Sequence, residues 1–518
     1  MKRMKLTFAG RVVVFVLIAA LLCTGGYFGY KYLAPADLID NFNSDILVNN
    51  EKDDDVVNKN IDVSDATINL SLDEWIGWKP IIDANQGLTT QPGSIFDQLG
   101  IKVNINVIND AEASSNALIK GDLNAAGYTL NRTAFLSGKF ADAGLDVVMP
   151  VFTNYSDGGD GIIALSNIDS IEDLVDAKIG VPKFSEAQSL VVWFVNKSDL
   201  TDAKKQKIID NLVLLDDAEQ TGQAFFAGSL DVAATWQPYL SNAENSTNSH
   251  ILFDTSSSNK LIMDGILFRA DFAQAHPDVV SKFIDGIFQA ESMYETEFDY
   301  IREVMPMFAG SSDGDILGMC GDAGLMGYSK NVDALENDCP IVFADMCTVW
   351  ESIGETVNHS LGATLFDTSY VKALSDNYSS LQNEEAFEIT EAQKEAAVDA
   401  KALLTKSATV NFIDDTAKFM DNSEADAALR EFVEIAKTLD GTIIQIEGNI
   451  NSTVTNEIGM KLSEERAKTV KNYLIANGID PDRIIVVGNG NTKMVVDVDS
   501  EDSYLNRRTD VFFKTIEG

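Results

Sequence analysis

The chain has 518 residues, which is more than one ordinary domain needs, so two or three domains are expected. Hydrophobic residues make up 45% and charged residues 23% of the sequence, a composition that excludes a largely disordered chain. The 80 Asp and Glu oppose only 39 Lys and Arg, and the resulting net charge of −41 disfavours nucleic acid and anionic lipid surfaces as partners.

The amino-terminal segment determines the expected compartment. Four cationic residues precede an uncharged apolar run at residues 12–28, and tyrosines follow it. A run of about 17 apolar residues is at the lower limit for a membrane-spanning helix. Because the cationic flank precedes the span, residues 1–33 are predicted to be a cytoplasmic stub and transmembrane anchor. The rest of the chain is then extracytoplasmic.

Two other interpretations of this segment stay open. A cleaved signal peptide would use the small residues Ala34, Pro35 and Ala36, and a lipoprotein would be anchored on Cys23. All three interpretations export the chain. Residues 34–65 are polar and acidic, with too little apolar surface for a core, and they predict a flexible linker.

Residues 66–400 alternate short β-type runs with helical stretches, which is typical of α/β architecture with largely parallel sheets. Small ligands bind such proteins at the carboxyl ends of strands. Polar and aromatic clusters follow several of the expected strands, including DEWIGW at residues 73–78 and SDGGD at residues 156–160. A buried carboxylate at Asp264, within an apolar strand, also requires a partner.

The order of these elements resembles the type II periplasmic solute-binding proteins, in the branch that includes taurine, nitrate and thiamine-precursor receptors. The similarity rests on ALIKGDLNAAGYTLN, SDGGDGIIAL and FFAGSLDVAATWQPYL, and it covers residues 66–309. It implies two lobes around a hinge, the second at about residues 156–260, with a small-molecule solute between them and an ABC permease as partner. The implied ligand-binding residues are Trp75, Trp78, Thr129, Asn131, Asp160, Ser185, Trp236 and Asp264. The residues do not identify the solute. Few basic side chains occur at the strand ends, and tryptophans beside carboxylates suit an amine as well as any other group.

Residues 408–518 predict a compact α+β domain in the order strand, helix, strand, helix, strand, strand. This segment resembles the OmpA-like peptidoglycan-binding domains through KLSEERAKTVKNYL, GIDPDRIIVVGNG and the Asn506-Arg507-Arg508 triplet. In that family a carboxylate and an arginine hold the diaminopimelate residue of the wall peptide. Here the arginine is Arg466, but the position of the carboxylate is Asn451, and Gly459 stands where Asn is usual. The resemblance therefore implies a weakened peptidoglycan site formed by Asn451, Arg466, Asn506 and Arg507.

Catalysis is not expected. The sequence has no Walker loop, no G-x-S-x-G, no H-E-x-x-H and no C-x-x-C motif, and it contains only three histidines. The cysteines are Cys23, Cys320, Cys339 and Cys347. We predict no catalytic residue, no metal site and no cofactor. The expected function is that of an extracytoplasmic solute-binding protein, anchored in the membrane and directed to peptidoglycan. A solute sensor, or a structural tether between membrane and wall, is the alternative.

Overall fold

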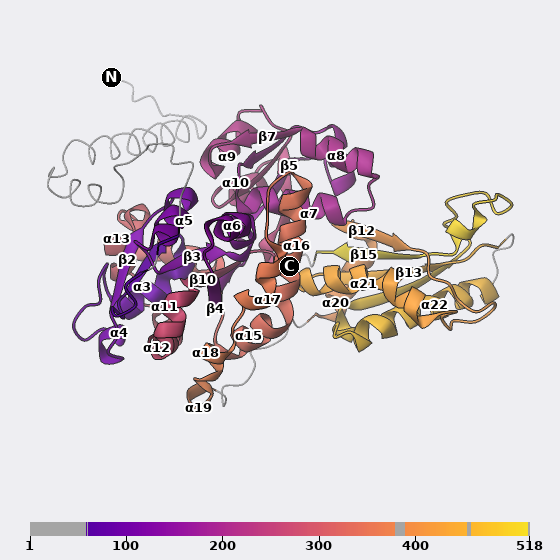
Figure 1. Ribbon diagram of the computed structural model, residues 1–518. Coiled ribbons are helices and arrows are strands. Elements are labelled where there is room, and N and C mark those ends of the chain that lie inside the picture. Colours follow the sequence, from indigo (N-terminus) through magenta and orange to yellow (C-terminus); the bar gives the residue numbers. More distant parts are fainter. Residues whose placement is uncertain (1–57, 60, 259, 379–388, 453–456, 516–518) are drawn as a thin grey trace, which may run out of the picture. The chain divides into compact units, whose positions relative to one another are not determined.

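The computed structural model describes residues 58–515, except for residues 60, 259, 379–388 and 453–456 (Figure 1). The predicted anchor at residues 12–28 and most of the predicted linker lie outside the described residues. Of the helices in the described ranges, none combines the length and the apolar composition that crossing a membrane requires.

The first lobe is built on a six-stranded sheet in the order β11-β4-β10-β3-β1-β2. Its strands are β1 (Ile68–Leu72), β2 (Val103–Val107), β3 (Ala125–Thr129), β4 (Val147–Ser156), β10 (Met263–Arg269) and β11 (Ala323–Leu325). Every residue of β3 and β10 is buried, as expected for strands covered by helices on both faces. The helices of this lobe are α3 (Lys79–Asn85), α4 (Ile95–Gln98), α5 (Ala111–Lys120), α6 (Leu130–Ala143), α11 (Ala270–Ala275), α12 (Pro277–Ala290) and α13 (Asp299–Val304).

The second lobe has a five-stranded sheet in the order β7-β6-β8-β5-β9. Its strands are β5 (Asp160–Leu165), β6 (Ile179–Pro182), β7 (Leu212–Leu215), β8 (Val232–Trp236) and β9 (Ser249–Asp254). Its helices are α7 (Glu186–Lys197), α8 (Asp202–Asp210), α9 (Ala218–Phe226) and α10 (Tyr239–Glu244). The sheet is magenta in Figure 1 and the first lobe is mainly indigo.

The chain crosses between the lobes twice, from β4 to β5 and from β9 to β10. In each sheet the strand that follows a crossing, β5 or β10, is inserted antiparallel to its two neighbours. The two sheets therefore have the same arrangement, with three strands on one side of the inserted strand. This repeated topology confirms the predicted two-lobed α/β fold.

Helices after residue 312 surround the lobes. They are α14 (Asp313–Cys320), α15 (Tyr328–Asp333), α16 (Cys339–Ser352), α17 (Gly362–Leu365), α18 (Ser369–Lys372) and α19 (Ser375–Tyr378). Helix α16 contacts α6 of the first lobe and α7 of the second. Trp350 donates its indole N–H to the carbonyl of Asn131, and Lys197 forms an ion pair with Asp345 at 3.0 Å. A single helix thus joins the two lobes.

The carboxyl-terminal domain has a four-stranded sheet in the order β12-β15-β13-β14. Its elements are α20 (Glu391–Asp399), β12 (Leu404–Ala408), α21 (Asn422–Thr438), β13 (Ile443–Asn449), α22 (Glu457–Ala476), β14 (Ile484–Gly490) and β15 (Thr509–Lys514). A Cβ on Gly448 would lie 2.0 Å from the carbonyl oxygen of Ser463, so α22 packs against β13 only because this position is glycine. The first strand, β12, begins before the predicted start of the domain at residue 408, and Phe412 beyond it forms an isolated bridge with Phe419.

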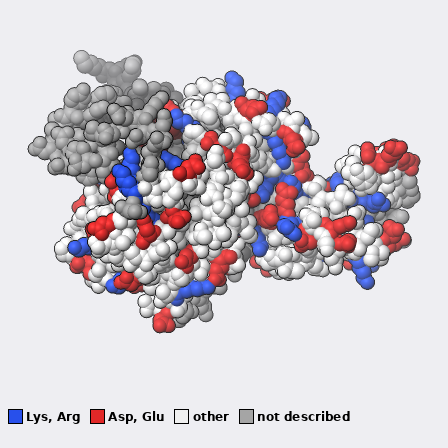
Figure 2. Space-filling model, in the orientation of Figure 1, with Lys and Arg blue, Asp and Glu red and all other residues white. Residues whose placement is uncertain are grey.

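The acidic excess does not gather into one patch on the face that Figure 2 shows. Asp and Glu are scattered over it among Lys and Arg, with broad uncharged areas between them. Such a surface keeps a protein soluble and identifies no docking partner.

Candidate functional site

The carboxyl edge of the first sheet collects polar side chains from four strands. Thr129 ends β3 and is paired across the sheet with Asp264, near the start of the antiparallel β10. Asp73 follows β1, and Ser156 ends β4. Because β10 runs opposite to its neighbours, its beginning lies at the same edge as their ends. Two of the predicted residues, Thr129 and Asp264, are therefore brought together here.

The matching edge of the second sheet carries three other predicted residues. Asp160 begins β5 and is paired with Trp236 at the end of β8. Ser185 caps α7, since its hydroxyl accepts from the backbone N–H of Gln188. Asp160 and Ser185 are buried, whereas Trp236 is 39% exposed. The predicted residues of both lobes thus lie at the edges where a ligand between two α/β lobes is expected to bind.

The carboxylates at this site have few cationic partners. Trp75 donates its indole N–H to Asn154 Oδ1 at 2.9 Å and to Asp264 Oδ2 at 3.1 Å. Ser156 donates to Asp160 Oδ2 at 2.7 Å. Burial raises the pKa of Asp160 to about 7. Burial, together with the nearby charge of Asp73, raises the pKa of Asp264 well above its ordinary value.

Trp78 and Asn131 have structural roles that their sequence positions did not reveal. Trp78 is 1% exposed and donates its indole N–H to Asp73 at 2.7 Å, so it packs in the core and orients that carboxyl. Asn131 is also 1% exposed and donates its amide to Ser189 of the second lobe at 2.9 Å. Asn131 therefore joins the lobes.

Arg132 and Glu186 form a forked ion pair between the lobes, and neither residue was predicted as a site residue. Arg132 Nη2 lies 2.8 Å from Glu186 Oε2, and Arg132 Nε donates to Glu186 Oε1 at 3.0 Å. Thr129 Oγ1 donates to the same Oε1 at 2.7 Å. Arg132 follows the predicted residue Thr129 closely, and Glu186 directly follows the predicted residue Ser185. Both Arg132 and Glu186 lie in the first turn of a helix rather than at a strand end. Lys183, a basic residue just after β6, instead forms an exposed ion pair with Asp216.

The first lobe contains a cavity of about 10 Å³ beside Asp73 and Arg132, lined also by Ser114 and Tyr128. All of its lining residues belong to the first lobe, and its volume is about the minimum for one water molecule. The two lobes contact each other directly through Arg132 and Glu186. In the described residues no group of His, Cys, Asp and Glu is arranged to hold a metal ion. Cys320, Cys339 and Cys347 are free and buried.

Two of the four predicted wall-binding residues of the carboxyl-terminal domain, Asn451 and Asn506, are in direct contact. Asn451 Oδ1 accepts from the amide of Asn506 at 3.1 Å, and Asn506 Oδ1 accepts from the backbone N–H groups of Val495 and Val496. Arg466 lies over the ring of Phe412, 4.9 Å from its centroid. Burial and the nearby positive charge of Arg507 both lower the pKa of Arg466.

The positive charge of Arg466 is therefore not neutralised by an ion pair with another described residue. Its Nε donates to the carbonyl of Thr416 at 3.0 Å. Among the described residues no ion pair to Arg466 is recorded, although Asp414 and Asp415 are near enough to act on its pKa. A guanidinium group that forms no ion pair can bind a carboxylate ligand through two parallel hydrogen bonds.

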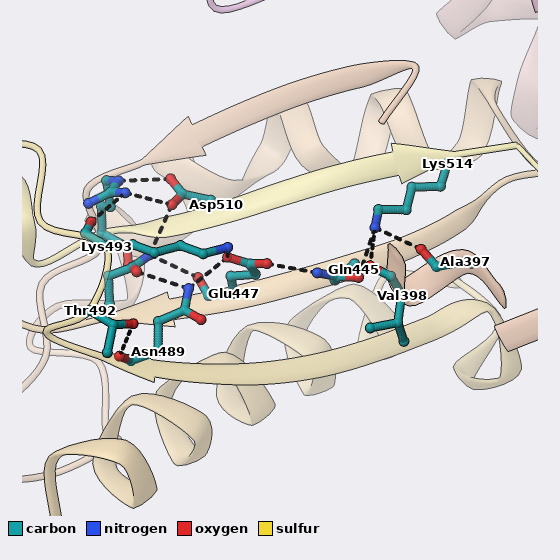
Figure 3. Close-up of polar contacts among 11 residues, drawn as sticks. Ala397, Val398, Gln445, Glu447, Asn489, Thr492, Lys493, Asp510 and Lys514 are labelled. Carbon is teal, nitrogen blue, oxygen red and sulfur yellow. Dashed lines mark hydrogen bonds and ion pairs between the residues drawn. The ribbon is translucent and has the colours of Figure 1, made fainter. Parts of the chain in front are cut away.

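A polar network that was not predicted lies along β13 in the same domain (Figure 3). Gln445, Glu447 and Asn449 alternate with apolar residues and so share one face of the strand. Glu447 is 3% exposed and pairs with Lys493 at 2.6 Å, while Asn489 and Gln445 donate to its two oxygens. Burial opposes its charge, but these donors outweigh that effect and lower the pKa of Glu447. The network stabilises the domain.

Comparison with known proteins assigns the carboxyl-terminal domain. Residues 411–508 match the OmpA family. The outer membrane protein A of Bordetella avium is 32% identical over 120 residues, which are 23% of this chain and 60% of that protein. The peptidoglycan-associated lipoprotein of Pseudomonas putida is 34% identical over 87 residues, 16% of this chain and 52% of that protein. The chain thus spans little more than half the length of these relatives.

The two lobes are similar to solved binding proteins. The periplasmic aliphatic sulphonate binding protein of Escherichia coli has a TM-score of 0.46 and 13% identity, over 59% of this chain and 98% of that one. The periplasmic nitrate-binding protein of Synechocystis PCC 6803 has a TM-score of 0.42 and 9% identity, over 60% of this chain and 89% of that one. The chain thus combines two α/β lobes with a carboxyl-terminal domain that matches the OmpA family.

Proposed function

We propose that the protein is an extracytoplasmic solute-binding protein of an ABC-type importer, held at the membrane by residues 12–28 and directed to peptidoglycan by its OmpA domain. The observation that carries the receptor proposal is the meeting of two α/β lobes at their carboxyl edges, with buried polar residues from both sheets. Such edges bind small molecules because loops and helix N-termini direct polar groups into the crevice between the lobes.

The candidate ligand-binding residues fall into three groups according to where they lie relative to the crevice between the lobes. Trp75, Thr129, Asp160 and Asp264 lie at the meeting edges and are retained in the proposal. Trp78, Asn131 and Ser185 would act indirectly, through the core or a helix cap. Trp236 is exposed enough to meet a ligand only at the rim.

Native mass spectrometry of the full chain, purified without denaturation in detergent, tests the receptor proposal. A bound small molecule is expected to add a defined mass that is lost when the protein is unfolded and refolded. A bare chain, with no change in melting temperature across amino acids, sulfonates, amines and phosphonates, would refute solute binding.

Sedimentation with purified peptidoglycan tests the second part. We expect the chain to co-sediment, and Arg466→Ala to reduce the bound fraction because it removes the forked cation. Arg430→Ala is the matched control, since Arg430 is an exposed arginine on the neighbouring helix α21, paired with Asp426. Equal binding by both variants would show that the domain does not use the family's site.

A sensor or tether without transport remains the second candidate, and the joining of both lobes by α16 favours it. Asn131 accepts from Trp350 of that helix, and Lys197 pairs with its Asp345. Opening the lobes would have to break one of these contacts. Small-angle scattering with and without solute separates a solute-binding protein from a locked tether, because a receptor or sensor that closes on its solute changes its radius of gyration and a locked tether does not.

A further inference from the structure

One carboxylate of the protein's own chain lies where the two lobes meet. Glu186 is the first residue of α7 in the second lobe, and Arg132 lies in the first turn of α6 in the first lobe. Both oxygens of Glu186 are used, because Oε1 accepts from Thr129 Oγ1 and Arg132 Nε, and Oε2 lies 2.8 Å from Arg132 Nη2. The forked arrangement is the one in which arginine holds a carboxylate most strongly.

The surroundings of this carboxylate form a site suited to an anion. Thr129 caps α6, which has 14 residues, and Ser185 caps α7, which has 12. Each helix N-terminus favours a negative charge, and here two of them meet beside an arginine and a hydroxyl donor. Burial opposes the charged form of Glu186, but Arg132 and the hydrogen bonds prevail and lower its pKa. Glu186 therefore remains an anion in this site.

The backbone beside Glu186 holds it in place. Phe184 adopts φ 56°, a left-handed conformation that a bulky residue rarely takes, and its ring stacks on Phe135 of α6 at 5.0 Å. One turn further along α7, Ser189 accepts from Asn131 at 2.9 Å. Three side-by-side contacts between α6 and α7 thus fix the carboxylate at the lobe boundary.

We infer that Glu186 is an internal ligand that occupies the anion subsite of the cleft, joins the lobes without a solute and sets the specificity of the site. This inference rests on the proposed receptor function and deepens it. An anionic solute has to displace Glu186 from Arg132 and Thr129. A neutral or cationic solute does not have to displace Glu186. It contacts Asp160 and Asp264, neither of which forms an ion pair with another described residue.

Isothermal titration calorimetry of the full chain with ethanesulfonate and with sulfate tests this inference. Glu186→Ala vacates the subsite and leaves Arg132 unpaired, so we expect it to bind at least one of these anions at least about tenfold more tightly than the unmodified chain. The double variant Glu186→Ala/Arg132→Ala is expected to lose this gain. Glu219→Ala is the matched control, because Glu219 is exposed in the first turn of α9 in the same lobe.

Small-angle scattering supplies the second readout. Glu186→Ala is expected to have a larger radius of gyration than the unmodified chain, and ethanesulfonate is expected to reverse the increase. If Glu186→Ala loses its folded circular dichroism spectrum, Glu186→Gln removes the charge while keeping the shape, and the same gain is expected in weaker form.

Equal anion affinity in the folded variant and the unmodified chain would overturn the inference, as would a gain that survives in the double variant. Failure of the receptor proposal gives a different pattern. In that case native mass spectrometry finds no solute on the unmodified chain, while the anion gain of Glu186→Ala is still measured.

Discussion

Replacing Asp160 by asparagine should stabilise the protein at neutral pH. Asp160 is 9% exposed, and its carboxyl accepts from Ser156 at 2.7 Å. Burial raises its pKa from an ordinary 3.8 to about 7. The folded chain therefore binds this proton more tightly than the unfolded chain does. The stabilisation that results is complete below the unfolded pKa and is lost as the pH rises through the folded value.

The size of the effect follows from that difference in pKa. A shift from 3.8 to about 7 corresponds to about 4 kcal/mol, because each pKa unit is worth 1.36 kcal/mol. Asparagine resembles the neutral acid and carries no charge to bury. The free energy of unfolding of Asp160→Asn should thus equal that of the unmodified chain near pH 4 and exceed it by up to about 4 kcal/mol at pH 8.

Urea unfolding followed by tryptophan fluorescence, at several pH values from about 4 to 8, measures this difference. Asp216→Asn is the control, since the Asp216 side chain is 71% exposed and pairs with Lys183 at the surface. Such a pair contributes about 0–1 kcal/mol, and its removal should leave the shape of the pH profile unchanged. Parallel profiles for Asp160→Asn and the unmodified chain would refute the reasoning.

Four further outcomes are expected. Asn451→Asp restores the carboxylate of the OmpA family, and it should tighten binding of a diaminopimelate-containing peptide by about 1–2 kcal/mol in calorimetry. Asn449→Asp, two residues away, should instead lower the melting temperature, because Asn449 donates its amide to a buried carboxylate. Glu447→Gln removes the ion pair to Lys493 and should destabilise the domain by about 1–3 kcal/mol at pH 7. Because the folded pKa of Glu447 is lowered, this deficit should shrink as the pH falls through that value, and a deficit independent of pH would contradict the assignment. Trp75→Phe removes the donor to the Asp264 site and should cost about 1–3 kcal/mol in thermal unfolding, whereas an unchanged melting temperature would show that the indole N–H is dispensable.

Much of the fold was predictable because the strands are marked by their own residues. The runs TINLSL, GIIALS and VAATW became β1, β5 and β8, since apolar β-type segments of this length are buried wherever they pair. The helix expected from residue 272 is divided by Pro277 into α11 and α12, because proline begins a helix readily and cannot continue one.

The site was predictable only in part. A strand end is visible in the sequence, and Thr129 and Asp160 were predicted in that way, whereas Asp264 was predicted from its charge within an apolar strand. The partner of a side chain across two lobes is not visible, because Arg132 and Glu186 are 54 residues apart and meet only when the lobes close. Phe184 gives no local signal for its left-handed backbone either.

The sequence by itself determined the two-lobed α/β class, the OmpA domain and the substitution of Asn451 for its carboxylate, since these depend on local periodicity and on residue identity. Only the tertiary structure decided which charges are neutralised. Glu186 satisfies Arg132, while Asp160 and Asp264 are buried with hydrogen-bond donors alone. The physical reason is that the free energy of a charged group depends on its burial and on its neighbours in space, and neither can be read from the order of residues along the chain.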